Sequence, residues 1–224
     1  MGHINHSVWV AGASGLVGRA LLDVLLEQPL NVSALVRRPI DDLPKSQRLH
    51  QQRVDYSRAD LGGDINGAPQ ALYIALGTTI KQAGSQEAFK AVDLDAVLQV
   101  ARAARKAGAK RCAVVSALGA SSLSAVFYNR IKGAAEDQLK AVGFERLVIA
   151  RPSLLIGDRA ALGQPVRAGE VWGERIAKPF QSLIPSRWRP IAAERVAHAM
   201  VRTLAQDGPA VQVLESNALQ TLGA

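Results

Sequence analysis

Three residues in the middle of the chain have the types and the spacing of a proton-transfer site. Ser116 ends an apolar run, Tyr128 comes 12 residues later, and Lys132 stands four positions after Tyr128. On a helix, positions i and i+4 share a face, so the phenol and the ammonium are expected to lie together. A phenol has an ordinary pKa near ~10, and a neighbouring cation favours phenolate, which eases proton exchange with a carbonyl or alcohol oxygen. The Ser116 hydroxyl can hydrogen-bond that same oxygen.

The pattern Tyr-x-x-x-Lys is weak evidence by itself, because a half-buried helix tyrosine beside a solvated lysine has the same spacing. Its weight comes from the order of features along the chain. The stretch Arg111–Ser116 is predicted to be a buried strand with Ser116 at its carboxyl end. Ligands of open parallel sheets bind at that edge. We therefore predict that Ser116, Tyr128 and Lys132 form a catalytic triad.

The stretch V-W-V-A-G-A-S-G-L-V-G-R, residues 8–19, predicts a strand, a glycine turn and a helix in succession. In this context one glycine permits the sharp turn, one lets the backbone approach a pyrophosphate, and one allows close packing of helix on strand. The phosphate then sits at the positive end of the helix. The contacts expected from this segment come from Gly12, Ser14, Gly15, Leu16, Val17 and Gly18. The segment predicts dinucleotide binding.

The second predicted strand, Asn31–Val36, is followed by Arg37 and Arg38 rather than by an acidic residue. In dinucleotide folds an acid at this point holds the ribose 2′-hydroxyl of NAD, whereas an arginine accommodates the 2′-phosphate of NADP. The alternative is a pair of solvated arginines at a strand end. We expect NADP(H) to be preferred, with NAD(H) as the other candidate.

Other strand ends carry residues suited to a cofactor. Asp55 follows the third predicted strand and can accept a hydrogen bond from an adenine amino group, although a loop-capping role explains it nearly as well. Gly77 lets the backbone approach the ribose and nicotinamide half, and Thr78 offers a hydroxyl. Lys132 is expected to reach the ribose hydroxyls as well.

Strand-like and helix-like apolar segments alternate along the chain, which predicts a soluble α/β protein with a doubly wound parallel sheet, the Rossmann fold. We expect one domain, residues 1–224. Helices are expected after the first strand, around Tyr128, over Ala88–Ala107 and over Ile191–Leu204, with a polar loop at Lys81–Glu87. Residues 157–190 contain Trp172, Phe180 and Trp188 but have poor periodicity. We expect them to cover the substrate. The remaining predicted strands are Leu49–Val54, Ala71–Leu76, Glu145–Ala150 and an edge strand at Val211–Leu214.

The stretches A-G-A-S-G-L-V-G-R, A-L-G-T-T, V-V-S-A-L-G-A, Y-N-R-I-K-G-A-A-E and A-R-P-S-L-L-I-G resemble the extended or atypical short-chain dehydrogenase/reductase family. They are similar in particular to its Tat-interacting-protein-like oxidoreductases, neighbours of the NAD-dependent epimerase/dehydratase family. The resemblance implies a Rossmann fold, the same triad, and Pro152, Ser153 and Leu154 beside the nicotinamide. The chain departs from the family at Asp93, where an asparagine is usual, and this puts the usual proton-relay contact in doubt.

The composition of the chain limits the kinds of partner and cellular location that we expect. The net charge is +8, but no run of five like charges occurs and aromatic residues are few, so nucleic-acid binding is not favoured. We expect no metal site, no membrane span and no leader peptide. One cysteine, Cys112, excludes a disulfide framework and suggests a cytoplasmic location. A homodimer through the long helices is compatible with the resemblance.

Together these features predict an NADP(H)-dependent oxidoreductase that reduces a small carbonyl compound. One alternative is a non-catalytic, cofactor-loaded redox sensor or partner-binding module, which would have no need of a proton donor. Another is an NAD-dependent isomerase or epimerase. The roughly seventy residues after the sixth strand are fewer than sugar-nucleotide epimerases usually carry there, which counts against a nucleotide-sugar substrate.

Overall fold

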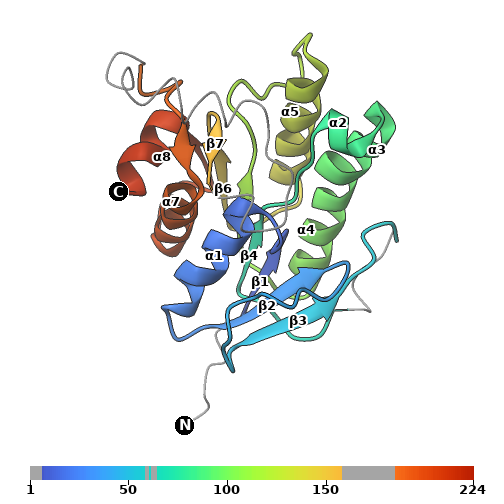
Figure 1. The fold of residues 1–224 in the computed structure, drawn as a ribbon, viewed down its shortest axis with the longest axis vertical. Helices are drawn as coiled ribbons and strands as arrows, with labels where there is room; N and C mark the ends of the chain where they lie inside the picture. Colours follow the sequence, from blue (N-terminus) through green and yellow to red (C-terminus); the bar gives the residue numbers. More distant parts are fainter. Residues whose placement is uncertain (1–6, 59–60, 62–64, 158–184) are drawn as a thin grey trace.

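Parallel strands form the centre of the protein in the computed structural model, which describes residues 7–58, 61, 65–157 and 185–224 (Figure 1). Seven strands lie in one sheet in the order β3-β2-β1-β4-β5-β6-β9, and each neighbouring pair is parallel. Their bounds in that order are Leu49–Arg53, Asn31–Val36, Ser7–Ala11, Ala71–Ile74, Arg111–Val115, Arg146–Arg151 and Val211–Glu215. The doubly wound Rossmann sheet is thereby confirmed.

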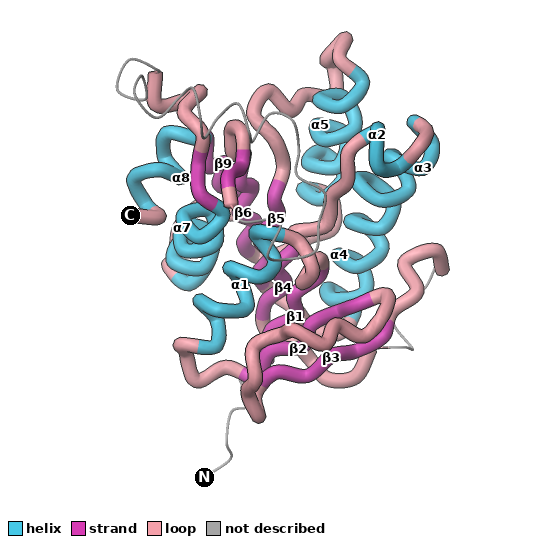
Figure 2. The backbone as a smooth tube through the Cα atoms, in the orientation of Figure 1, coloured by secondary structure: helices cyan, strands magenta, loops and turns pink. Residues whose placement is uncertain are grey.

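Helices cover both faces of this sheet, as the tube in Figure 2 shows. One face carries α1 (Leu16–Leu26), α7 (Ala193–Ala205) and α8 (Ser216–Leu222). The other face carries α2 (Ile80–Ala83), α3 (Gln86–Lys90), the π-helix η1 (Ala91–Ala96), α4 (Val97–Lys106) and α5 (Phe127–Lys140). No helix in the described part of the chain is long and apolar enough to cross a membrane.

The strand sequences follow from this double cover. In β1, Val8 and Val10 belong to the core beneath α1 and α7, whereas Trp9 and Ala11 belong to the core beneath α4. Side chains of a strand alternate between the two faces, so a strand covered on both sides must be apolar throughout. The edge strand β3, Leu49–Arg53, has one neighbour and is correspondingly polar and half-exposed.

The order of the strands reverses at β1, which lies between β2 and β4. Connections leave the sheet in opposite directions on the two sides of such a point, so a crevice opens at the carboxyl ends of the strands. The glycine turn after β1 and the segment Gly77–Thr79 after β4 both lie at this edge. The topology therefore places the predicted cofactor contacts together.

Two local predictions are wrong, and a third is right in outline. The segment Lys81–Glu87 is not a loop, because Thr79 caps α2 and Ser85 caps α3, each accepting a hydrogen bond of 3.1 Å from a first-turn amide. The long helix predicted over 88–107 is present, but residues 91–96 of it form the π-helix η1, which was not predicted. Ile191–Ala192 is not helical but forms the strand β8, paired with β7 (Leu155–Ile156).

Helix α8 was not anticipated from the sequence. The segment 157–190 was expected to cover the substrate. Its residues 158–184, which include Trp172 and Phe180, lie outside the part of the chain that the structure describes. Trp188 is described, and it is 62% exposed.

Candidate functional site

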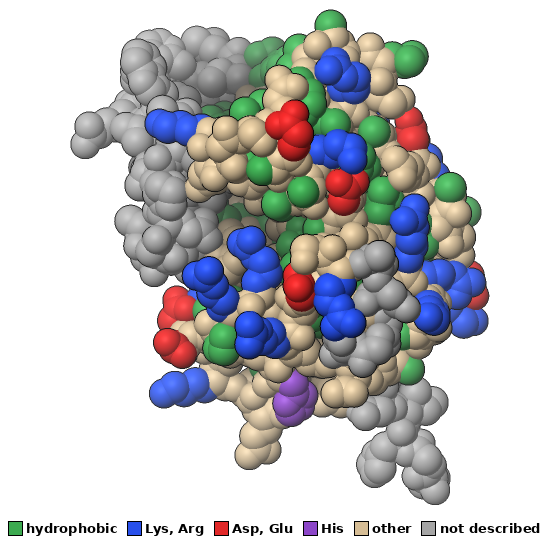
Figure 3. Space-filling view, turned by 90° about the vertical axis from the view of Figure 1, so that its right-hand side faces the viewer, with side chains coloured by type: hydrophobic (Ala, Val, Ile, Leu, Met, Phe, Trp, Pro, Cys, Tyr) green, Lys and Arg blue, Asp and Glu red, His purple; other side chains and the backbone are tan. Residues whose placement is uncertain are grey.

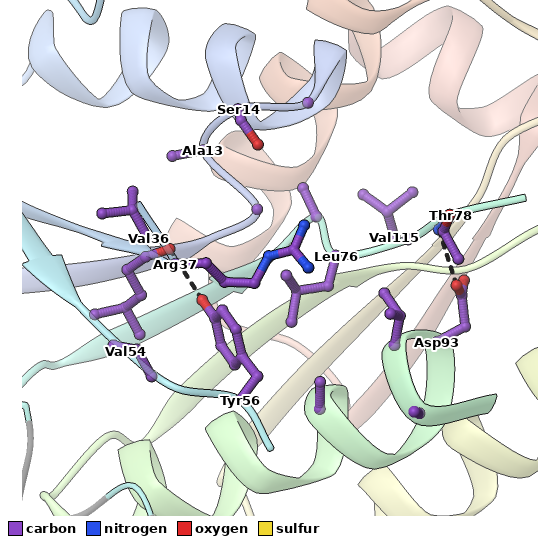
Figure 4. A pocket seen from close by; sticks show the side chains of 18 of the residues that line it. Ala13, Ser14, Val36, Arg37, Val54, Tyr56, Leu76, Thr78, Asp93 and Val115 are labelled. Atoms are coloured by element: carbon purple, nitrogen blue, oxygen red, sulfur yellow. Dashed lines mark hydrogen bonds between the residues drawn. The ribbon is translucent and has the colours of Figure 1, made fainter. Parts of the chain in front are cut away.

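A cavity of about 1160 Å³ opens along the carboxyl ends of β2, β1, β4 and β5. The glycine turn and the residues after β2 and β3 line one part of it, and η1 with the first turns of α5 lines another. Figure 4 shows Ser14, Arg37 and Tyr56 of the first group and Asp93 of η1 around the same space. The predicted cofactor contacts and the predicted triad therefore line the same cavity. The residues concerned are Gly12, Arg37, Gly77, Ser116, Tyr128 and Lys132.

The glycine turn has the backbone geometry that an anion site requires. Gly12 has φ +93°, and a Cβ there would lie 2.5 Å from the Ala75 carbonyl carbon. A Cβ on Gly18 would lie 1.9 Å from the Gly12 oxygen, so only glycine lets α1 pack this closely on the turn. Gly15 caps α1 without a side-chain hydrogen bond. The first amides of α1 are therefore left for a ligand at the positive end of the helix.

We expect Gly18→Ala to lower the melting temperature far more than Gly15→Ala. The added methyl group at Gly18 meets backbone at 1.9 Å, whereas at Gly15 the nearest atom is the Gly12 oxygen at 3.4 Å. Overpacking of this kind costs about 2 kcal/mol or more. Thermal unfolding of the two variants measures the difference, and equal melting temperatures would show that close helix packing does not explain the third glycine.

Arg37 occupies the part of the cavity next to the end of β2. In Figure 4 its side chain reaches between Ser14 and the ring of Tyr56. The Tyr56 hydroxyl donates a 2.9 Å hydrogen bond to the Leu35 carbonyl, and burial raises the pKa of this phenol despite the nearby guanidinium. Arg38 lines the cavity beside it. Both predicted arginines are thus at the cavity.

A third arginine, Arg53 at the end of β3, also lines the cavity and was missed from the sequence. Its position follows from register, because β3 pairs with β2 so that Arg53 lies opposite Val36. None of Arg37, Arg38 and Arg53 forms an ion pair with any described residue. Figure 3 shows Lys and Arg side chains gathered in the lower half of one face, the half that β2 and β3 occupy in Figure 1. This end of the cavity is suited to an anion.

Asp55 lines the same end of the cavity, where an adenine contact was predicted. Its carboxylate accepts hydrogen bonds from the Ser57 hydroxyl at 2.7 Å and from the Ser57 amide at 3.0 Å. These bonds lower the pKa of Asp55. The Asp55 carboxylate therefore caps its own loop. Asp55 also lines the cavity, so its contact with adenine stays a prediction.

Lys132 is buried at the other end of the cavity and is held by Asp93 of η1. The Lys132 Nζ lies 2.7 Å from Asp93 Oδ1, and Asp93 Oδ2 accepts the Thr78 amide at 2.8 Å (Figure 4). Burial works to lower the pKa of Lys132, but the Asp93 carboxylate, followed by Tyr128 and Glu136, raises it overall. Lys132 is thus a fixed cation paired with a buried anion. Gly77 lies next to this pair, since a Cβ on Gly77 would be 3.7 Å from Lys132 Nζ.

Tyr128 lies one turn before Lys132 on α5, half-buried and in the cavity wall, as the spacing predicts. Its ring packs against buried Phe89 with the ring centroids 5.5 Å apart. The aromatic contact fixes the ring between α3 and α5. The structure therefore places the phenol and the ammonium on one face of α5 beside the cavity.

Ser116 is buried at the end of the β5 segment, and its hydroxyl donates a 2.5 Å hydrogen bond to Glu136 Oε1. Glu136 is four positions beyond Lys132 on α5 and accepts two hydrogen bonds from Arg151, at 2.9 and 2.5 Å. Arg151 in turn pairs with Glu215 of β9 at 3.0 Å. These bonds hold β5, α5, β6 and β9 together. The Ser116 oxygen borders the cavity, but its hydrogen faces Glu136.

Several predicted cofactor residues do not line the cavity. Gly18 lies behind the turn, in agreement with its predicted packing role. Pro152 is buried, and its carbonyl accepts the Leu118 amide at 3.0 Å. Leu154 is exposed, and it is Leu155 that reaches the cavity. Gly77 and Thr78 line the cavity as predicted.

The parallel sheet, its switch point at β1 and the glycine turn define an NAD(P)-binding Rossmann protein. The uncapped start of α1, the glycines that no Cβ could replace and the cavity beside them fit a dinucleotide. Consistent with this, the NAD(P)H-binding family matches residues 12–207. The chain belongs to this family.

Curated relatives support the family over nearly the whole chain. Protein HTATIP2 of Rattus norvegicus is 31% identical, covering 98% of this chain and 90% of that protein. Protein FMP52, mitochondrial, of Debaryomyces hansenii is 31% identical, covering 96% of this chain and 97% of that protein. Protein FMP52, mitochondrial, of Eremothecium gossypii is 32% identical over 95% of each chain. The resemblance stated from the sequence is confirmed.

Solved structures share the fold at low identity. MoeE5 in complex with UDP-glucose and NAD superposes with a TM-score of 0.69 at 17% identity, covering 97% of this chain and 81% of that chain. UDP-glucuronic acid 4-epimerase from Bacillus cereus in complex with NAD gives 0.68 at 14%, covering 94% and 76%. At such identities the likeness establishes the fold alone.

The expectation of a cytoplasmic location is wrong. The fungal relatives FMP52 are named as mitochondrial proteins. The expectation depended on the single cysteine, Cys112, which is buried in the core. A lone buried thiol excludes an intrachain disulfide but does not distinguish one reducing compartment from another.

Proposed function

We propose that the protein is an NADP(H)-dependent oxidoreductase that reduces a small carbonyl compound. The observation that carries the proposal is the shared cavity, in which the anion-binding turn and Arg37 lie at one end and Tyr128 with Lys132 at the other. A dinucleotide held by its pyrophosphate at the turn directs its two halves toward these two ends. The test is NADPH consumption with a panel of aldehydes and ketones.

In the proposed reaction Tyr128 supplies the proton. When bound, NADPH would supply a hydride, with its electron pair, to the carbonyl carbon. As the carbon–oxygen π bond breaks, the oxygen takes the proton of the Tyr128 phenol, and the product is an alcohol. The phenolate left behind is stabilised by the Lys132 ammonium and regains its proton from water.

Ser116 is proposed as the second group at the substrate oxygen. A hydroxyl has one hydrogen to donate, and that of Ser116 is given to Glu136 in this structure. To bind a carbonyl oxygen, Ser116 must turn this hydrogen toward the cavity. Because the bond to Glu136 would then be broken, Ser116 contributes less to turnover than Tyr128 in this account.

Arg37→Ala is expected to weaken NADPH binding by about tenfold to a hundredfold and to leave NADH binding little changed. The expected loss corresponds to one charge-assisted contact with the 2′-phosphate, which NADH lacks. The measurement is the ligand-induced rise in melting temperature, because a ligand that binds only the native state raises its stability.

The matched control is Arg202→Ala. Arg202 is exposed on the last turn of α7 and does not line the cavity. The Arg202→Ala substitution removes the same charge from the protein but lies outside the proposed cofactor site. Equal losses for NADPH and NADH in Arg37→Ala, or a larger rise with NADH in the unmodified protein, would reverse the assigned cofactor preference.

The other two candidate functions give different outcomes. A redox sensor or partner-binding module would bind NADPH tightly but consume none with any carbonyl in the panel. An isomerase or epimerase would retain tightly held NAD on purification. The buried Lys132–Asp93 pair beside Tyr128 favours the reductase over the sensor or binding module, since neither binding nor sensing requires a positioned cation next to a phenol.

A further inference from the structure

The connection between β2 and β3, residues 37–48, carries two arginines of the cavity but has no helix or strand of its own. Its first residues, Arg37 to Ile40, line the cavity together with the glycine turn. In Figure 4 the Arg37 side chain lies between Ser14 of that turn and the ring of Tyr56. A segment without regular backbone hydrogen bonds depends on side-chain contacts for its position. The contacts that hold residues 37–48 therefore decide where the two arginines lie.

Two of these contacts hold the connection to β3 and to the end of α1. The Gln51 side chain of β3 accepts a hydrogen bond from the Ile40 amide and donates one to the Ile40 carbonyl, both at 2.9 Å. At the other end of the connection, Arg48 donates to the carbonyls of Leu26 and Gln28, where α1 ends. The part of the connection between Ile40 and Arg48 needs a further contact.

Arg19, near the start of α1, provides that contact. Its guanidinium donates to the Asp42 carbonyl at 2.6 Å and to Asp42 Oδ1 at 2.5 Å, and the hydrogen bond lowers the pKa of Asp42. Neither Arg19 nor Asp42 lines the cavity. Because α1 begins at the glycine turn, the pair ties the arginine-bearing segment to the helix whose first amides are proposed to bind the pyrophosphate.

Global stability does not explain this pair well. The Asp42 side chain is 61% exposed, and an exposed ion pair usually contributes little to stability because water screens it. The Arg19 side chain is only 13% exposed and bonds Asp42 at two points, which fixes the direction as well as the distance of the contact. A ligand that spans two sites loses less affinity to ordering when both sites are already in place.

We propose that the Arg19–Asp42 pair is a clamp that holds Arg37 and Arg38 in place relative to the glycine turn, so that the 2′-phosphate and the pyrophosphate of NADP(H) bind together. Arg19 and Asp42 are then positioning residues for cofactor preference. The inference rests on the proposed preference for NADP(H). The clamp itself can be observed without any cofactor.

Asp42→Ala tests the clamp because electrostatics and positioning predict opposite results. Removing a negative charge from this segment would by itself favour a phosphate group nearby. Loss of the clamp is instead expected to raise the Kd for NADPH about tenfold and to leave the Kd for NADH little changed, since NADH has no 2′-phosphate. Fluorescence titration with each reduced cofactor measures both constants. Arg19→Met removes both hydrogen bonds and should weaken NADPH binding at least as much.

The matched control is Asp41→Ala. Asp41 is exposed one position before Asp42 and forms no ion pair with any described residue, so its removal changes the charge but leaves the clamp. Its Kd for NADPH is expected to stay the same or to fall. Without cofactor, amide hydrogen exchange at Ile40 should be at least about fivefold faster in Asp42→Ala, and unchanged in Asp41→Ala, because the freed segment opens more often.

An unchanged or lower Kd for NADPH in Asp42→Ala would overturn the inference, and so would unchanged exchange at Ile40. A parallel rise in the Kd for NADH would also overturn it, since it would show a general disturbance of the fold. Equal binding of NADPH and NADH by the unmodified protein would refute the proposed cofactor preference before any variant is made, and the role of the clamp in that preference would be refuted with it.

Discussion

Tyr128→Phe is expected to lower kcat/KM for a carbonyl substrate at least about a hundredfold while NADPH still binds. The phenylalanine keeps the ring that packs on Phe89, with its centroid at 5.5 Å, so α5 and the cavity wall are retained. Only the proton donor is lost. Turnover is measured by NADPH oxidation, and binding is measured by the NADPH-induced rise in melting temperature.

Tyr56→Phe is the matched control for this variant. Tyr56 lines the same cavity, but its hydroxyl donates to the Leu35 carbonyl and is remote from Lys132 in the wall. Its loss should cost about 1 kcal/mol of stability and leave the chemical step intact. Normal turnover in Tyr128→Phe would show that another group donates the proton.

Lys132→Met is expected to destabilise the protein by about 3–5 kcal/mol at neutral pH, the second large effect. The substitution removes the cation 2.7 Å from Asp93 and strands a buried carboxylate with only the Thr78 amide as a described partner. Breaking one side of a buried ion pair costs more than replacing both sides. The double variant Asp93→Asn/Lys132→Met should therefore recover much of the loss. Urea unfolding of the three proteins measures it.

The pH dependence of these variants follows from the same pair. The pKa of Lys132 is raised in the folded protein, so its contribution to stability is full below the unfolded value of about 10.4 and is lost as pH rises through the folded pKa. The unmodified protein thus keeps this contribution throughout the neutral range. The stability difference between the unmodified protein and Lys132→Met should therefore be full at neutral pH and shrink only as the pH rises above about 10. A difference that is already lost near about pH 8 would contradict the assigned pair.

The sheet could be predicted from the sequence because its strands are short apolar runs between glycine and polar residues. The strand β2 was placed with the bounds that the structure has, Asn31–Val36. The two short helices in 80–90 were missed, although Thr79 and Ser85 are capping residues. Helices of four and five residues show no apolar period, so only their caps could have revealed them.

One part of the site could be predicted from the sequence, because it lies on a single helix. Spacing within one helix brings Tyr128 and Lys132 together, and the same interval continues to Glu136. The partners of these residues could not be predicted, since they depend on packing between elements distant in the chain. Thus Ser116 gives its hydrogen to Glu136, 20 positions later, and Asp93 is brought to Lys132 by η1.

A crystal structure of the protein with NADP⁺ tests the proposed function most directly. We predict that the pyrophosphate lies on the amides at the start of α1, the 2′-phosphate lies at Arg37, and the nicotinamide ring lies beside Tyr128 and Lys132. A dinucleotide bound with its nicotinamide away from Tyr128, or bound outside the cavity above Gly12, would contradict it.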